Sequence, residues 1–417
     1  MGWRERLPEI RNVAEALGLK PPETNFWEVS ADRLYAIAAA GLPGHYAHWT
    51  IGRNYEQQRT SHQRGRGTIY EMVCNLDPCQ AYLLDENSDE IQEFVVSHVM
   101  GHTDLFRRNI YCQRMRVDMD QVLHAASLRF RAYEAEYGID AVESLLDIAH
   151  PLKFHARFEE LAAPTKAAGV PDDNYKGLFP AEQIDPSAIE RAFRERKRGV
   201  DLGIGETDIL RFLIRRAPLE EWQRDVLSVV RETGLYFQQI ARTKILHEGF
   251  ASWTHKRILR QISSSAVQDA WLNAGVAGNP GTNTPNPYWL GLTLLEYLEQ
   301  SGVDILELAR WESDTSLLGR IDEAFIQDNQ MLRETLRESK LNWRQLRDHM
   351  QRFAAQLPAV EVRISSVSSD VLRLEADVDV DANYAQPILN GIARLWHGRT
   401  ELVQPSNTLL NQGVHAS

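Results

Sequence analysis

Two histidines, His98 and His102, lie four residues apart in the segment His98-Val-Met-Gly-His102. On a helix this spacing aims both imidazole rings at one point, because residues i and i+4 share a face. Much later in the chain, Glu248 lies in the segment His247-Glu-Gly-Phe-Ala-Ser-Trp-Thr-His255. Two imidazoles and a distant carboxylate form a ligand set that zinc accepts in helix-built sites. We therefore predict that His98, His102 and Glu248 are metal ligands.

The histidine pair lies on a helical face that should be buried. At about 100° per residue, the apolar residues on the face of His98 are Ile91, Phe94, Val95, Leu105 and Phe106. Burying two imidazoles costs several kcal/mol unless their nitrogens find partners. A shared metal ion would satisfy both rings, and backbone or carboxylate groups are the alternative partners. Gly101, between the two histidines, indicates a close approach of another part of the chain.

Glu248 shares its helical face with Lys244 and His255. This face is either a solvated polar stripe or the side that brings Glu248 to the histidines. In the second case His255, two turns beyond Glu248, is a group that supports a ligand, a fourth ligand, or a proton carrier and so a candidate acid or base. His247 points about 100° away from Glu248 and is a weaker candidate.

Five further residues have possible functional roles. Asp104 is a second candidate acid or base, but it is offset by about 240° from His98 and reaches the site only if the helix ends near Gly101. The candidate substrate-binding residues are Lys244, Arg224, Tyr288 and His48. For His48 and Tyr288, packing of a loop and of a helix start is the alternative role.

Most of the chain is predicted to be helical. Asn87 and Ser88 offer an N-cap for the helix that carries the histidine pair, which should run to about Arg108. Helical patterns return over residues 207–262 and 288–356. The segment 69–84 is either extended or a buried helix, because it is rich in β-branched and aromatic residues.

The tail differs from the rest of the chain. Two runs with alternating apolar residues around 360–364 and 372–380 predict a hairpin, followed by a helix over about 384–396 and a strand over 400–403. We therefore predict a mainly α protein with a large helical domain over 1–357 and a small α+β domain of ββαβ order over 358–417. Within the large domain, a proline-rich excursion at about 164–187 and a glycine-rich joint at about 199–205 interrupt the helices.

Composition limits the classes of function. The net charge of −12 disfavours general nucleic-acid binding, and no apolar run reaches the length of a membrane span. The N-terminus has no apolar signal-peptide core, and three cysteines are too few for a disulfide framework. We expect a cytoplasmic protein.

Several motifs in order resemble the SpoVR family, the stage V sporulation protein R group. They are Tyr46-Ala-His48-Trp49, Tyr70-Glu-Met-Val-Cys-Asn75, His98-Val-Met-Gly-His102-Thr-Asp104, Trp222-Gln-Arg224, Thr243-Lys-Ile-Leu-His-Glu248-Gly-Phe-Ala, and Asn286-Pro-Tyr288. The resemblance implies a cytoplasmic location and a link to spore cortex formation or a stress response. It also implies association with a PrkA-like serine protein kinase and a protein with a von Willebrand A-like domain. The family pattern usually has asparagine in place of His247.

The metal-ligand residues also resemble those of gluzincin peptidases, whose Glu-Gly-Trp-Ala helix is similar to Glu248-Gly-Phe-Ala. This resemblance implies a zincin-like helical domain with zinc at His98, His102 and Glu248, although iron or manganese also suits such ligands. The general base of those peptidases would fall on Val99, which cannot take a proton. Two hypotheses stay open: a metal-dependent hydrolase acting on peptide or cell-wall-derived bonds, and an inactive scaffold that works through partners such as the kinase.

Overall fold

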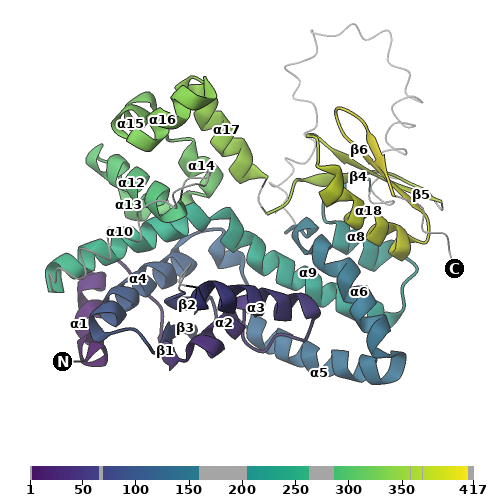
Figure 1. The fold of residues 1–417 in the computed structure, drawn as a ribbon, viewed down its shortest axis with the longest axis horizontal. Helices are drawn as coiled ribbons and strands as arrows, with labels where there is room; N and C mark the ends of the chain where they lie inside the picture. The colour runs from purple at the N-terminus through teal and green to yellow at the C-terminus, as the bar shows by residue number, and fades with distance from the viewer. Residues whose placement is uncertain are drawn as a thin grey trace, which may run out of the picture. The chain divides into compact units, whose positions relative to one another are not determined.

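The computed structural model describes residues 2–64, 69–158, 204–262, 286–356, 358–368 and 370–411. Helices dominate it, and the strands form only two small sheets, one of them in a small C-terminal α+β region, so the predicted mainly α class is confirmed. The chain divides into two compact units (Figure 1): unit 1 is Met1–Glu136 with Tyr236–Pro358, and unit 2 is Tyr137–Leu235 with Ala359–Ser417. The segment 137–235 thus groups with the tail, and the predicted domains 1–357 and 358–417 stay a prediction.

Unit 1 holds the candidate site. Its elements are α1 (Trp3–Ala16), β1 (Thr24–Val29), α2 (Ala31–Ala40), α3 (Trp49–Gln63), β2 (Glu71–Cys74), β3 (Cys79–Leu84), α4 (Asp89–Arg108), η1 (Cys112–Arg114), α5 (Met119–Tyr137), α10 (Lys244–Ile262), α12 (Pro287–Gln300), α13 (Ile305–Trp311), α14 (Asp314–Leu318), α15 (Glu323–Asp328), α16 (Gln330–Ser339) and α17 (Trp343–Ala355). The last turns of α9 (Glu221–Arg242) also belong to it.

A three-stranded sheet lies beside α4, with strand order β1-β3-β2. β1 pairs with β3 in parallel, and β2 pairs with β3 antiparallel, so that Glu71 lies opposite Leu83 and Val73 opposite Ala81. Ala81 and Leu83 belong to the same apolar core as Val95 and Val99 of α4. The extended interpretation of residues 69–84 is therefore correct, whereas β1 was not predicted from the sequence.

Helix α10 packs between α4 and α12, and glycines allow both approaches (Figure 1). A Cβ atom on Gly101 would lie 2.6 Å from the Cα atom of Ala251, and one on Gly249 would lie 2.5 Å from the backbone of Gly291. Side chains at these positions would push the helices apart. The close approach predicted at Gly101 is thus present, and it brings the histidines of α4 against α10.

The ends of the three site helices are fixed by side-chain caps. Ser88 caps α4 through the backbone N–H of Ile91, as expected. For α10 the cap comes from a distant part of the chain, because the buried carboxylate of Asp314 accepts hydrogen bonds from the N–H groups of Ile245 and Leu246, each at 2.9 Å. Asn286, the residue directly before α12, caps that helix by accepting a hydrogen bond from the backbone N–H of Tyr288. These caps set the position along each helix axis at which the site residues stand.

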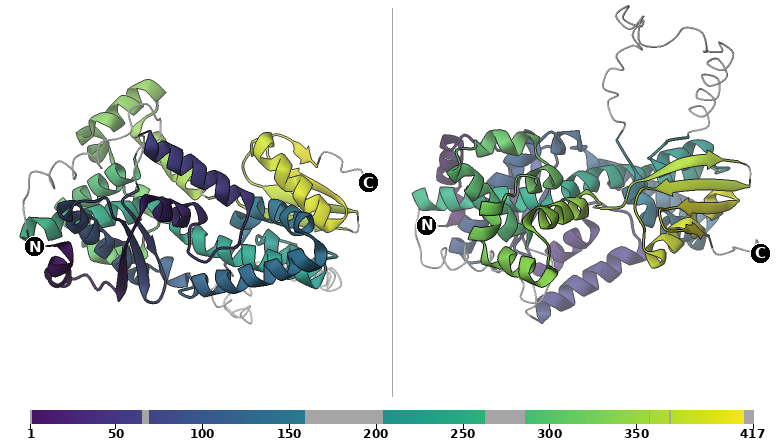
Figure 2. Two further views of the ribbon diagram at one scale, coloured as in Figure 1. Left: turned by 60° about the horizontal axis from the view of Figure 1, so that its bottom comes forward. Right: turned by 90° about the horizontal axis from the view of Figure 1, so that it is seen from above.

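Unit 2 combines helices with a four-stranded sheet. Its elements are α6 (Ile139–Leu152), η2 (Lys153–His155), α8 (Ile209–Arg216), most of α9, β4 (Val362–Val367), β5 (Val371–Ala376), α18 (Ala382–Trp396), β6 (Arg399–Val403) and β7 (Thr408–Leu410). The sheet order is β4-β5-β6-β7, with β5 and β6 parallel and α18 between them in the sequence. The predicted hairpin, helix and strand are present, and β7 is an additional strand (Figure 2).

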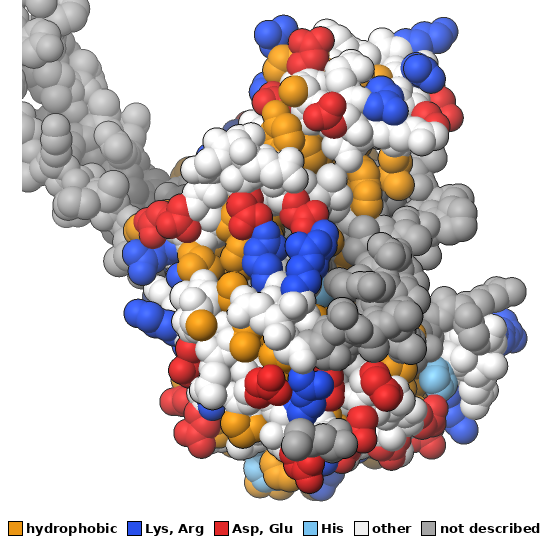
Figure 3. All heavy atoms as spheres, turned by 90° about the vertical axis from the view of Figure 1, so that its left-hand side faces the viewer, with side chains coloured by type: hydrophobic (Ala, Val, Ile, Leu, Met, Phe, Trp, Pro, Cys, Tyr) orange, Lys and Arg blue, Asp and Glu red, His pale blue; other side chains and the backbone are white. Residues whose placement is uncertain are grey.

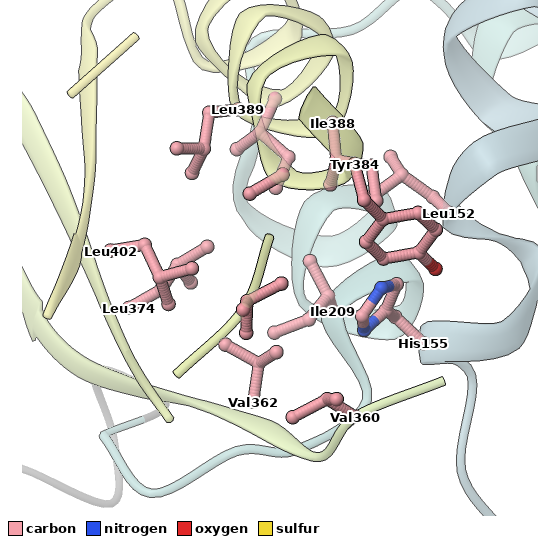
Figure 4. Close-up of a pocket in the computed structure, with 13 residues that line it drawn as sticks. Leu152, His155, Ile209, Val360, Val362, Leu374, Tyr384, Ile388, Leu389 and Leu402 are labelled. Atoms are coloured by element: carbon pink, nitrogen blue, oxygen red, sulfur yellow. The ribbon is translucent and has the colours of Figure 1, made fainter. Parts of the chain in front are cut away.

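An apolar cavity lies between the sheet of unit 2 and its helices (Figure 4). Leucine, isoleucine and valine side chains form most of its wall, including Leu152, Ile209, Val362 and Leu402. The imidazole of His155 also lines it, and this residue is only 4% exposed.

Several predicted segments lie outside the described residues. They are the proline-rich excursion at 164–187 and the part of the glycine-rich joint before residue 204. Among the described helices, none is long and apolar enough to cross a membrane. The face displayed in Figure 3 carries Lys and Arg side chains interspersed with Asp and Glu.

Candidate metal centre

Helices α4 and α10 bring the three predicted ligands together. The Nε2 atoms of His98 and His102 each lie 3.7 Å from the same carboxylate oxygen, Oε2 of Glu248. The two imidazole rings stand at 88° to each other with centroids 4.6 Å apart. His98 is buried, and the side chains of His102 and Glu248 are 12% and 16% exposed. The face of α10 that carries Glu248 is therefore not a solvated stripe.

Glu71 is a fourth member of this cluster, and no pattern in the sequence predicted it. Its Oε1 atom lies 3.9 Å from Nε2 of His98, and ligand atoms of Glu71, His98 and His102 all lie within 4.8 Å of one another. Glu71 comes from the first position of β2, on the face of the sheet that meets α4. A lone acidic residue in a short strand has no periodic partner in the sequence, so spacing could not reveal it.

Each imidazole of α4 is held from behind by a second imidazole of α10. The Nδ1 atoms of His98 and His255 are 2.9 Å apart, and those of His102 and His247 are 3.2 Å apart. In each pair one nitrogen must carry the proton that the other accepts. If His98 and His102 are the donors, their Nε2 lone pairs point towards Glu248.

His247 continues this chain of contacts. Its Nε2 atom lies 3.3 Å from the Sγ atom of Cys112, so both nitrogens of the ring have partners. Helical spacing makes His247 a weaker candidate, because it points away from Glu248. In the structure the ring also points away from Glu248. It still has a neighbour on α4, His102, because α4 runs past both His247 and His255 of α10.

Three buried imidazoles around the carboxylate, those of His102, His247 and His255, favour their neutral forms. Burial lowers the pKa of His102 and of His255 well below the ordinary value, and neighbouring imidazoles add to the effect. Burial likewise lowers the pKa of His247 to about 4. Neutral imidazoles carry the lone pairs that a metal ion requires.

The two carboxyl groups differ. Burial alone would raise the pKa of Glu248, but the imidazoles of His98 and His102, when they carry a proton, and the ammonium group of Lys244 lower it to about 2. For Glu71, burial and the charge of Glu248 raise the pKa above its ordinary value, and His98 opposes them. Glu248 is thus the fully ionised carboxylate of the cluster.

A metal ion fits this donor set. The Nε2 atom of His98 and the Oε2 atom of Glu248 are buried, and neither has a hydrogen-bond partner among the residues that the structure describes. Such atoms are costly unless something satisfies them. Atoms that bind one tetrahedral ion at about 2.0–2.2 Å lie about 3.3–3.6 Å apart, close to the 3.7 Å separations seen here. Two imidazoles and one or two carboxylates suit zinc, and also iron or manganese.

Two of the predicted substrate-binding residues lie at the cluster. The ring of Tyr288 stacks against that of His98 at a centroid distance of 6.0 Å. Burial and the carboxylates of Glu248 and Glu71 raise the pKa of the Tyr288 phenol, so it keeps its proton. Lys244 is exposed, one helical turn before Glu248, and its charge acts on that carboxylate.

The structure does not bring Asp104 to the cluster. Helix α4 continues to Arg108 instead of ending near Gly101, so the side chain stays on another face. Its carboxylate accepts hydrogen bonds from the Arg108 guanidinium and from the backbone N–H of Lys20, both at 2.6 Å. The candidate acid or base role of Asp104 is therefore withdrawn.

His48 and Arg224 have structural positions of their own. Nδ1 of His48 caps α3 and contacts the hydroxyl of Thr50 at 2.6 Å. Arg224 lies in unit 2, where its guanidinium donates to the carbonyls of Ile214 and Ala217 at the end of α8. Neither is among the residues that surround Glu248, so their predicted substrate-binding roles have no support here.

Val99 is fully buried in the apolar core. The residue after the first histidine therefore turns away from the ligands, and any base has to come from another element.

The family model described as SpoVR-like protein matches residues 4–332. The chain belongs to the SpoVR family. Its similarity to the uncharacterized protein YcgB of Escherichia coli (strain K12) is 27% identity over 323 residues, which is 70% of this chain and 62% of that protein. This SpoVR chain thus spans less than two thirds of the length of that relative. No solved structure matches it.

Proposed function

We propose that this SpoVR protein is a metal-dependent hydrolase whose ion is held by His98, His102 and Glu248, with zinc as the expected metal. The observation that carries the proposal is that buried metal-ligand atoms from α4 and α10, without hydrogen-bond partners among the described residues, converge on one point. When bound, zinc supplies Lewis acidity to a carbonyl group and to water.

Glu71 is the best candidate for the general base. It stands at the edge of the ligand cluster, 3.9 Å from Nε2 of His98, and it comes from strand β2. Helix α4 offers no carboxylate in this role, because the residue after His98 is the buried Val99. In hydrolysis of an amide bond, Glu71 takes one proton from the attacking water and passes it to the leaving nitrogen. The water oxygen forms the new carboxylic acid as the C–N bond breaks, so atoms and charge balance.

The remaining residues position these groups. His255 and His247 hold the rings of His98 and His102 through their Nδ1 atoms, so His255 acts as a positioning residue in place of a proton carrier. The neutral phenol of Tyr288, beside Glu248, can donate a hydrogen bond to a carbonyl oxygen of the substrate. Lys244 offers a positive charge at the exposed start of α10.

The family membership supports the wider setting of the proposal. We propose a cytoplasmic protein that acts on peptide or cell-wall-derived bonds during spore cortex formation or a stress response. A PrkA-like serine protein kinase and a von Willebrand A-like domain protein are the proposed partners.

A catalytically inactive scaffold is the second candidate function. The burial of Val99 favours it, because the helix that supplies two ligands supplies no base. Such a scaffold would keep the metal as a structural element and act through its partners.

The test begins with metal analysis of the purified chain. Wild type should hold about one zinc ion per chain, and His98→Ala and Glu248→Gln should hold at least about tenfold less. His349→Ala is the matched control, because His349 is an exposed helical histidine in α17. A wild-type chain without metal overturns the proposal. Metal without turnover of peptide and muropeptide libraries supports the scaffold.

A further inference from the structure

β2 is an edge strand, and the hydrogen-bond register shows which of its groups face outwards. The N–H of Leu84 donates to the carbonyl of Tyr70, so the paired positions on β2 are 70, 72 and 74. On β3, the N–H groups of Cys79 and Asp85 donate towards the β1 side, to Glu23 and Val29. Both observations agree: even-numbered residues join β2 to β3. The N–H and C=O groups of Glu71 and Val73 therefore point away from the sheet.

Among the described residues, no hydrogen bond engages the backbone of Glu71 or Val73 on that side. Both residues are only partly buried. Unpaired N–H and C=O groups on an edge strand are a template for another strand.

The same strand carries the carboxylate of the candidate centre. The side chain of Glu71 lies on the sheet face that meets α4, beside His98. A strand added to β2 would run about 4.8 Å from β2 and would pass Glu71. The backbone of the added strand would therefore come within reach of the ligand cluster. Amide groups spaced along an extended backbone match this edge, whereas a sugar chain lacks the alternating donors and acceptors.

We infer that the substrate binds as an extended peptide that pairs with the outward backbone groups of Glu71 and Val73. This inference rests on the proposed hydrolase function. It deepens that function because it names a peptide, and not a sugar chain, as the class of substrate. Backbone pairing provides affinity for many sequences, and side-chain contacts then select among them.

The test replaces Val73 by proline. Val73→Pro removes an outward N–H and no ladder bond, and proline is accepted on edge strands with that orientation. Val73→Ala is the matched control, because it shortens the side chain and keeps the N–H. The probe is a pool of random octapeptides, acetylated and amidated at their ends, with binding to the zinc-loaded full chain measured by fluorescence anisotropy. Zinc content and circular dichroism check the fold of each variant.

Val73→Pro should bind the pool about tenfold more weakly than Val73→Ala, with equal zinc content. The same pool with alternate amides N-methylated should bind wild type about tenfold more weakly than the plain pool. Equal affinity of the two variants, or no binding by wild type, overturns the inference. Peptide cleavage with equal KM in both variants also overturns the inference, but it supports the proposed hydrolase function. Binding that depends on the Val73 N–H, without any cleavage, supports the inference and contradicts the proposed hydrolase function.

Discussion

At the scale of single residues, the two carboxylates of the cluster come from different elements: Glu248 from α10 and Glu71 from β2. Glu248 faces both imidazoles of α4 equally, whereas Glu71 approaches from β2 on the side of His98. We therefore infer that Glu248 is the ligand and that Glu71 is the group that takes the proton of the water.

Glu71→Gln should therefore keep its zinc and lose turnover by at least about 100-fold, because an amide cannot accept the proton of water. Metal analysis and single-turnover peptide cleavage measure the two effects separately. Glu86→Gln, at an exposed turn of the same unit, serves as the control. If zinc is lost together with activity, Glu71 is a ligand and the assignment as base is wrong.

Three of the four residues at the centre of the cluster could be predicted from the sequence, because His98, His102 and Glu248 have helical spacing to partners. Glu71 could not, since a strand of four residues gives one carboxylate no distinguishing pattern. The contact between His247 and His102 depends on where α10 crosses α4, which spacing within one helix does not contain.

A second residue-level prediction concerns His155 in unit 2. Burial, aided by the charge of Arg157, lowers its pKa to about 4 from an ordinary value of 6.5. As pH falls below 6.5, the unfolded chain takes up the proton first, so the folded form loses stability until about pH 4. Between pH 7.5 and pH 5 this loss should be about 2 kcal/mol.

Urea unfolding at the two pH values measures this loss. His155→Gln cannot titrate, so its free energy of unfolding should change less with pH than that of wild type, by about the same 2 kcal/mol. Equal pH dependence in the two proteins would contradict the predicted shift.

At the scale of elements, the site depends on how closely α10 approaches α4. Gly101→Ala places a methyl group 2.6 Å from the Cα atom of Ala251, where backbone has to move. We expect a loss of about 1–3 kcal/mol in the free energy of unfolding and weaker zinc binding, because His98 and His102 move away from Glu248.

Gly52→Ala is the matched control for Gly101→Ala. Gly52 also lies within a helix, but nothing stands within 4 Å of the added Cβ atom. Alanine there should stabilise the protein by about 0.5–1 kcal/mol through helix propensity. Chemical denaturation and zinc titration of both variants give the comparison, and unchanged zinc affinity in Gly101→Ala would contradict the role of helix approach.

Element types were more predictable than their pairing. The Ser88 cap and the alternation in the tail follow from local patterns, and both are present. β1 has no such signal, because it exists through parallel pairing with β3. The cap of α10 by Asp314 likewise joins residues far apart in the chain.

At the scale of the whole molecule, the grouping of residues 137–235 with the tail has a physical basis. Ile148 of α6 lies against Gly391 of α18, and Phe212 of α8 contacts Trp396 with ring centroids 5.5 Å apart. Backbone hydrogen bonds also join residues 205 and 206 to Ile364 of β4. Sequence patterns place the tail as a separate domain because local periodicity does not report which distant helices cover its sheet.

A chain ending at Pro358 should therefore lose structure in α6 and α8, although both helices remain in the sequence. Without the sheet and α18, the apolar wall formed by Leu152 and Ile209 faces water, which costs about 25 cal/mol for each Å² exposed. Hydrogen–deuterium exchange should show α6 and α8 amides unprotected while α4 and α10 stay protected and zinc binding persists. A chain ending at residue 411 is the control, since it keeps all of β7. Full protection of α6 in the shorter chain would show that the tail and the helices of unit 2 fold independently, as the domains predicted from the sequence require.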